Sequence, residues 1–130
     1  MDKPYTTVQR NDYTLTIFHG IAPLDPVNAN VDVHVTFPNG ESFSAVFFTP
    51  QNIETLMKGY EETGECANGL YFWTSDMLIV QKLTEQTICE IIENLLAEGE
   101  FASVFSKNKE SEIISPKDGD KLFKRFDESL

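Results

Sequence analysis

The stretch from residue 64 to residue 80, GECANGLYFWTSDMLIV, constrains the fold of this chain more than any other. It is the most apolar and aromatic part of the sequence, and it contains the only tryptophan, Trp73. Aromatic and β-branched residues favour strands, and the segment TSD at 74–76 supplies turn residues between the two halves. We therefore predict a central hairpin, with strands over residues 70–73 and 77–80, against which two amphipathic helices pack.

Three earlier segments alternate between apolar and polar residues, as half-buried strands do. They are YTLTIFHG (13–20), VDVHVTF (31–37) and SFSAVFF (42–48). Asn39-Gly40, between the last two, is the strongest short hairpin signal, because both residues of that turn adopt a positive φ. Residues 21–30 contain two prolines and two asparagines, which predict a loop.

Two segments have the periodicity of amphipathic helices. The first begins at Thr49-Pro50 and ends at Gly64, and the second begins at Thr84 and ends at Gly99, because threonine caps a helix start and glycine a helix end. The apolar stripes are Ile53, Leu56, Met57 and Tyr60 in the first helix, and Ile88, Ile91, Ile92, Leu95 and Leu96 in the second.

These elements predict an α+β fold, a mainly antiparallel sheet with two amphipathic helices packed on it, in the order β-β-β-α-β-β-α. A single domain is expected over residues 13–105, with residues 100–105 as a last strand or a docked turn. Residues 1–12 are polar and are expected to be a flexible N-terminus. Residues 106–130 are expected to be a loosely docked polar tail with a short helix around Leu122.

The charge of the chain is strongly acidic and unevenly distributed. The formal net charge is −11, from 10 basic and 21 acidic residues. Residues 107–130 contain six basic and six acidic residues, so the whole excess falls in residues 1–106. Such a field repels nucleic acid and anionic membranes and speeds association with basic proteins. The alternative is that the acidity serves solubility.

The sequence contains no catalytic apparatus that we recognise. It has no GxSxG, HExxH, phosphate-binding glycine loop or paired CxxC. The two histidines, His19 and His34, lie in separate strands without a nucleophile motif nearby. Cys66 lies among glutamates, which oppose thiolate formation, and Cys89 lies at the edge of an apolar helix face. We predict no catalytic residues, no metal site and no cofactor.

We also recognise no membrane-spanning or secretory segment in the sequence. No segment approaches the ~20 apolar residues that span a bilayer. The first 12 residues lack the apolar run of a secretory signal. We expect a cytoplasmic protein, a monomer or weak dimer, that contacts neither membranes nor nucleic acid.

Three stretches, FFTPQNI (47–53), TGECANGLYFWTSDMLIV (63–80) and LLAEGEFASVF (95–105), carry a family resemblance. Together they resemble the small acidic immunity proteins of bacterial contact-dependent growth inhibition, which pair with the C-terminal toxin domain of a large exported effector. The resemblance implies a non-enzymatic cytoplasmic protein that binds its cognate toxin domain and blocks the active site. Many such toxins are nucleases with basic clefts, which an acidic inhibitor suits.

Candidate partner-binding residues follow from charge and placement. Residues 54–100 contain ten acidic residues and only Lys58 and Lys82 as basic ones, a net charge of −8. For any one carboxylate, the alternative is a solvated helix face. Aromatic side chains serve as anchors when they face outward. The candidates are Glu61, Glu62, Glu65, Asp76, Glu90, Glu93 and Glu98, with Tyr71 and Trp73 as aromatic anchors.

Two other classes of function stay open at this point. The first is an adaptor or subunit that binds a basic protein unrelated to toxins. The second is a small enzyme or ligand-binding protein that uses the aromatic hairpin as a pocket wall. It predicts a cavity with converging polar groups near Trp73 and a requirement for His34 or Asp76.

Overall fold

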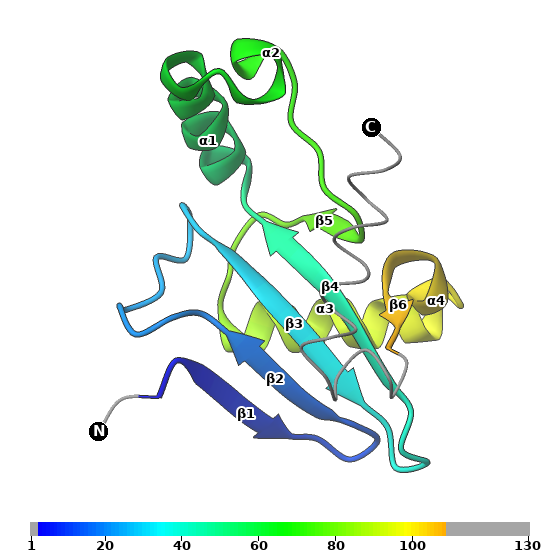
Figure 1. Cartoon of the computed structure of the whole chain (residues 1–130). Coiled ribbons are helices and arrows are strands. Elements are labelled where there is room, and N and C mark those ends of the chain that lie inside the picture. Colours follow the sequence, from blue (N-terminus) through cyan, green and yellow to red (C-terminus); the bar gives the residue numbers. More distant parts are fainter. Residues whose placement is uncertain (1–2, 109–130) are drawn as a thin grey trace, which may run out of the picture.

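Residues 3–108 are described by a computed structural model, in which helices pack on a twisted sheet (Figure 1). The α+β class is therefore confirmed. The elements are β1 (Tyr5–Gln9), β2 (Thr14–Phe18), β3 (Asn30–Thr36), β4 (Ser42–Phe48), α1 (Pro50–Thr63), α2 (Glu65–Gly69), β5 (Met77–Ile79), α3 (Glu85–Ala97), α4 (Phe101–Val104) and β6 (Ser106–Lys107).

The sheet is open and mainly antiparallel, as predicted. Its strand order is β1-β2-β3-β4-β5, and β6 also pairs with β4. Strands β1 to β4 form an antiparallel meander. The outer edge of β4 is shared, since its second half pairs in parallel with β5 and its first half pairs with β6.

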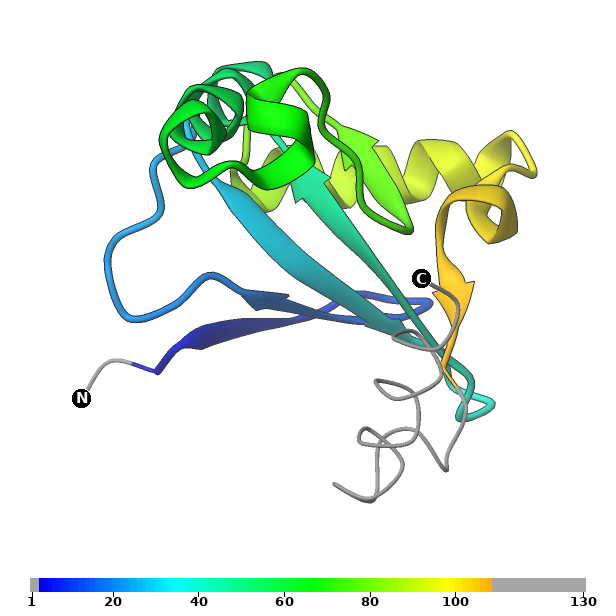
Figure 2. The same ribbon diagram turned by 45° about the horizontal axis from the view of Figure 1, so that its top comes forward.

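The core lies on one face of the sheet, where α3 crosses the strands (Figure 2). Alternation along β2, β3 and β4 points Leu15, Val33 and Phe47 toward this face, and all three are fully buried. Ile88 and Ile92 of α3 are buried against them. The polar residues of the same strands consequently line the opposite face, away from α3. At the end of β4 this face is covered by Phe72, which packs on the buried Phe48.

The turn between β3 and β4 occurs where Asn39-Gly40 predicts it, but its geometry differs. Among the described residues, Gly40 has φ 91° whereas Asn39 does not have a positive φ. The Gly40 amide donates to the Phe37 carbonyl at 2.9 Å, and the Phe37 amide donates to the Glu41 carbonyl at 2.9 Å. Pro38 favours a type I turn because its ring fixes φ near −65°, and the glycine then supplies the left-handed residue.

The prediction of a flexible segment over residues 1–12 is wrong for Tyr5–Gln9, which form β1. This strand pairs with β2 in a regular antiparallel register, Tyr5 opposite Phe18 and Val8 opposite Leu15. Val8 packs against the core cluster, which gives the strand one apolar anchor. β1 is the edge strand of the sheet, so one of its faces and its unpaired backbone edge are exposed to water. A short, polar sequence suits this position.

The predicted central hairpin is wrong. Residues 70–73 form no strand, and Met77–Ile79 pairs in parallel with β4. The connection from β4 to β5 runs through α1 and α2, and a crossover of this kind brings the next strand back in the same direction. The aromatic residues before β5 pack against α1 and the end of β4 instead of pairing with β5.

Helix α1 begins as predicted, with Thr49 as the cap and Pro50 in the first turn. The Thr49 hydroxyl accepts a hydrogen bond from the Asn52 amide at 3.3 Å. Gly64 ends the helix with φ 87°, also as predicted. No residue of α1 is buried, and its apolar stripe is only half-buried because the helix lies beyond the end of β4 (Figure 1).

Helix α3 and the segment after it complete the fold. The Thr84 hydroxyl accepts from the Thr87 amide at 3.1 Å, and Gly99 follows the helix with φ 74°. Of the two alternatives for residues 100–105, the docked turn is correct, in the form of α4. Ser106–Lys107, the start of the expected polar tail, pair with β4 as β6. The predicted helix around Leu122 lies outside the described residues.

Candidate partner-binding surfaces

Five of the predicted binding residues lie on a lobe at one end of the sheet. We define the acidic–aromatic lobe as α1, α2 and residues 70–73. These segments are consecutive in the sequence and lie together beyond the end of β4 (Figure 1). Its carboxylates are exposed, and Tyr71 and Trp73 expose 49% and 57% of their surface. Leu70, at 79%, adds a third exposed apolar side chain. The predicted carboxylates on it are Glu61, Glu62 and Glu65, and Glu54 of α1 is a fourth.

An aromatic contact attaches this lobe to the sheet. The ring of Phe72 packs edge-on against Phe48 at the end of β4, with 5.0 Å between centroids. Its other side stacks on Tyr60 of α1 at 6.3 Å. Phe72 therefore points inward, whereas its neighbours Tyr71 and Trp73 are exposed.

The lobe is also held in a backbone conformation that most residues avoid. Cys66, Ala67 and Asn68 in α2 have φ of 48°, 53° and 62°, a left-handed turn without glycine. Each such residue costs roughly 1–2 kcal/mol. Gly69 follows with φ 82° and lies directly against the backbone of Met57 in α1. Backbone strain of this kind concentrates at binding and switch regions, and it occurs here beside the exposed aromatic residues.

The other candidates lie elsewhere on the molecule. Asp76 occupies the turn before β5 with φ 55°, and its carboxylate accepts a hydrogen bond from the Ser106 hydroxyl. Glu90 is exposed on α3 and Glu98 is exposed directly after it, away from the lobe. Glu90 lines a groove of about 430 Å³ between α3 and β5, whose apolar walls include Leu78 and Ile91. The structure therefore does not bring the candidates together into one surface.

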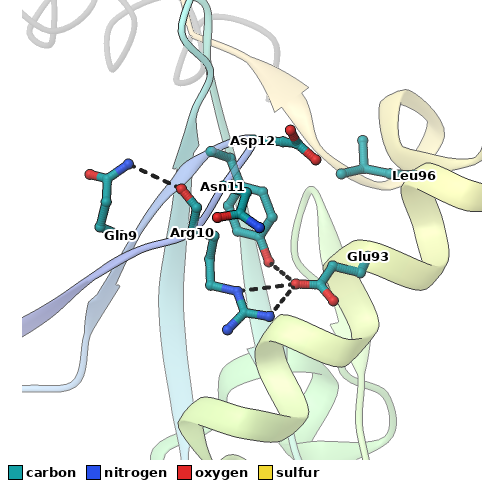
Figure 3. Close-up of a pocket in the computed structure, with 7 residues that line it drawn as sticks. Gln9, Arg10, Asn11, Asp12, Glu93 and Leu96 are labelled. Carbon is teal, nitrogen blue, oxygen red and sulfur yellow. Dashed lines mark hydrogen bonds and ion pairs between the residues drawn. The ribbon is translucent and has the colours of Figure 1, made fainter.

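Glu93 has a structural role (Figure 3). Its carboxylate accepts hydrogen bonds from the Arg10 guanidinium at 2.8 Å and from the Tyr13 hydroxyl at 3.0 Å. These contacts connect α3 to the turn between β1 and β2 and line one side of a shallow pocket of about 440 Å³. Because its carboxylate is already paired, Glu93 is a poorer docking residue than the lobe glutamates.

The pKa values follow from this cluster. The hydrogen bond from Arg10, and then that from Tyr13, lower the pKa of Glu93. Burial, reinforced by the hydrogen bond to Glu93, raises the pKa of Tyr13. Burial also raises the pKa of the Cys89 thiol beside them, which keeps it protonated and unreactive.

One pocket on the face of the sheet opposite α3 brings together His34 and Asp76, the two residues that the ligand-binding alternative names, although Trp73 does not line it. It has a volume of about 230 Å³ and lies between β3, β4 and the turn at Ser75-Asp76. Asp32 and His34 line it, and burial lowers the pKa of His34. The alternation of residues 31–37 already placed both side chains on the polar face. The convergence with Asp76 depends on the parallel pairing of β5, which the sequence pattern did not predict.

Other site types find no support in the described part of the chain. Residues 3–108 contain no group of three or more histidine, cysteine, aspartate or glutamate side chains arranged for a metal ion. Over the same residues, no helix is both long and apolar enough to cross a bilayer. Cys66 and Cys89 are free thiols, one half-buried and one buried.

Comparison with known proteins gives no relative for this chain. No family model matches it, and neither the curated proteins nor the solved structures yield a match.

Proposed function

We propose that this protein is a non-catalytic immunity protein that binds a basic toxin domain through the acidic–aromatic lobe and blocks its active site. The observation that carries the proposal is the combination of exposed carboxylates and exposed aromatic rings on one lobe. Aromatic side chains dominate the binding energy of protein interfaces, and monomers seldom expose several of them side by side. The resemblance to immunity proteins supplies the class of partner.

The glutamates and the aromatic residues of the lobe have separate roles in this proposal. Glu61, Glu62 and Glu65 have no ion pair among the described residues, whereas Glu54 on the same helix pairs with Lys58 at 3.2 Å. Unpaired carboxylates attract a basic cleft over about 10 Å at moderate ionic strength. Tyr71 and Trp73 then supply the apolar contact area that slows dissociation. In the complex, the carboxylates occupy subsites that bind phosphates of the toxin's substrate.

The proposal is tested by a protection assay. The reading frame directly upstream is identified, and its C-terminal domain, about 150 residues as is typical of one domain, is expressed in cells. Growth is scored with and without this protein in the cytoplasm. Relief of toxicity by this chain supports immunity. Toxicity without relief contradicts it and favours the alternative, an adaptor for another basic protein, whose gene need not follow a toxin gene.

The docking surface is tested by two matched charge reversals. One variant carries Glu61→Lys, Glu62→Lys and Glu65→Lys on the lobe, and the control carries Glu90→Lys, Glu98→Lys and Glu100→Lys on and after α3. Each set changes the formal net charge by six, from −11 to −5. We expect the lobe variant to associate with the toxin domain about tenfold or more slowly than the control at low salt. Equal slowing would mean that net charge, and not the lobe, governs association.

A further inference from the structure

The pocket lined by His34 lies on the face of the sheet opposite α3. Its volume of about 230 Å³ is smaller than the 300–1,000 Å³ of most pockets for cofactors and drug-sized ligands, so it accommodates one side chain. The residues that line it and enter the argument are Asp32, His34, Ser44, Val46, Ser75 and Asp76.

Three segments that are distant in sequence build this pocket. In the antiparallel pair, Asp32 lies opposite Val46 and His34 lies opposite Ser44. The turn before β5 is fixed beside them because the Val46 amide donates to the Asp76 carbonyl at 2.8 Å. The positive φ of Asp76 turns the chain there, and its carboxylate accepts from the Ser106 hydroxyl of β6.

The pocket carries negative charge that no described cation neutralises. In residues 3–108 the ion pairs join Arg10 to Glu93, Lys58 to Glu54 and Lys107 to Glu41. None of these pairs includes Asp32 or Asp76, and no lysine or arginine lines the pocket. Two acidic residues, Asp32 and Asp76, thus line a small cavity that is open to solvent on one side.

His34 adds a neutral hydrogen-bonding group. Its ring packs edge-on against Phe18 with 4.9 Å between centroids, which leaves the imidazole half-buried. Burial lowers the pKa of His34, against the opposing effect of Asp32, so the imidazole is neutral at neutral pH. Its ring nitrogens form no side-chain hydrogen bond with another described residue, unlike His19, which bonds to Thr6 and to the Gly20 carbonyl.

We propose that this pocket receives the guanidinium group of an arginine side chain from a basic partner protein. A guanidinium presents five N–H donors in one plane, and the pocket offers two carboxylates and the unprotonated imidazole nitrogen as acceptors. Lysine, with a compact ammonium group, fits this planar set of acceptors less well. The identity of the partner rests on the proposed function, in which the protein binds a basic toxin domain.

The two histidines provide the test, since one lies in the pocket and the other does not. The full chain is titrated with N-acetyl-arginine amide, and the Hε1 signals of His34 and His19 are followed by NMR. N-acetyl-citrulline amide, the uncharged isostere, is the ligand control. We expect a saturable shift of His34 with arginine amide, a weak or absent response to citrulline amide, and an unchanged His19 signal.

Variants decide whether the two carboxylates hold the ligand. Asp32→Asn with Asp76→Asn preserves size and tolerates the positive φ at position 76. We expect it to weaken arginine-amide binding about tenfold or more, because both charge-assisted contacts become neutral. Asp12→Asn with Asp25→Asn, both outside the pocket, is the control matched in charge and is expected to bind as the parent does. An unshifted His19 signal in each variant verifies that the fold is intact.

Several results would overturn the proposal. These are equal shifts with citrulline amide, parallel shifts of both histidines, undiminished binding by the double variant, or no saturable shift with arginine amide on the order of tens of millimolar. If the titration fails and the protection assay succeeds, the proposed function is retained and only the arginine site is rejected. A positive titration with a failed protection assay retains the arginine site and replaces the toxin with another basic partner.

Discussion

Gly69 is the position where a single methyl group has the largest calculable effect on the acidic–aromatic lobe. A Cβ added there would lie closer to the carbonyl oxygen of Met57 than Cβ atoms approach in real structures, and 3.2 Å from the carbonyl carbon. The two nearest atoms are backbone atoms of Met57, so α2 has to move away from α1. Gly69 also has φ 82°, at which any other residue is strained.

The cost of Gly69→Ala is estimated from these two effects. The positive φ costs roughly 1–2 kcal/mol for a residue with a Cβ. Displacing packed backbone adds about 1–3 kcal/mol, the usual range for overpacking. Gly20 separates the two effects, because it has the same φ of 82° and nothing within 4 Å of an added Cβ. Gly20→Ala is therefore expected to lower the free energy of unfolding only by the roughly 1–2 kcal/mol that the positive φ costs.

Urea unfolding followed by two probes measures this difference. Trp73, the only tryptophan, reports on the lobe by fluorescence, and far-UV circular dichroism reports on the whole fold. We expect Gly69→Ala to lower the free energy of unfolding by about 2–5 kcal/mol, or to make the fluorescence transition precede the dichroism transition. If Gly69→Ala and Gly20→Ala behaved alike by both probes, the close contact between α1 and α2 would be refuted.

Two further predictions concern a helix cap and pH dependence. Thr49 is fully buried, and its hydroxyl accepts from the amides of Asn52 and Ala29 at 3.3 Å, so Thr49→Ala should cost about 1–2 kcal/mol in urea unfolding. The half-buried cap Thr84→Ala should cost less, and the reverse order would contradict the burial argument. The hydrogen bonds from Arg10 and Tyr13 lower the pKa of Glu93 in the folded state. The stability that they contribute is therefore present above the pKa of the unfolded state and is lost as pH falls through the folded-state pKa. Tyr13→Phe should therefore lower the urea midpoint at about pH 7 and have a smaller effect at about pH 3, and a pH-independent effect would show that the Glu93 contact does not matter.

Local signals determined most of the element boundaries. Thr49-Pro50, Gly64, Thr84 and Gly99 begin and end the two long helices where the sequence predicts, because caps act through backbone groups of the same turn. The alternation of residues 31–37 and 42–48 likewise fixes which side chains face the core. These features depend on residues only a few positions apart.

The placement of the aromatic stretch depended on the tertiary structure. Residues 70–73 have strand-forming composition, yet they form no strand because Phe72 inserts between Tyr60 and Phe48. The parallel pairing of β5 follows from the crossover through α1 and α2, and composition carries no information on strand direction.

The same division applies to the candidate sites. The sequence by itself determined the acidic excess, the absence of recognisable catalytic motifs and the outward-facing positions of Asp32 and His34. Only the tertiary structure decided that the Glu93 carboxylate accepts hydrogen bonds from Arg10 and Tyr13, which are more than 75 positions away in the sequence. It also decided that Asp76 lies in the same pocket as His34. Contacts between distant segments depend on how strands pair and chains cross, which no local pattern encodes.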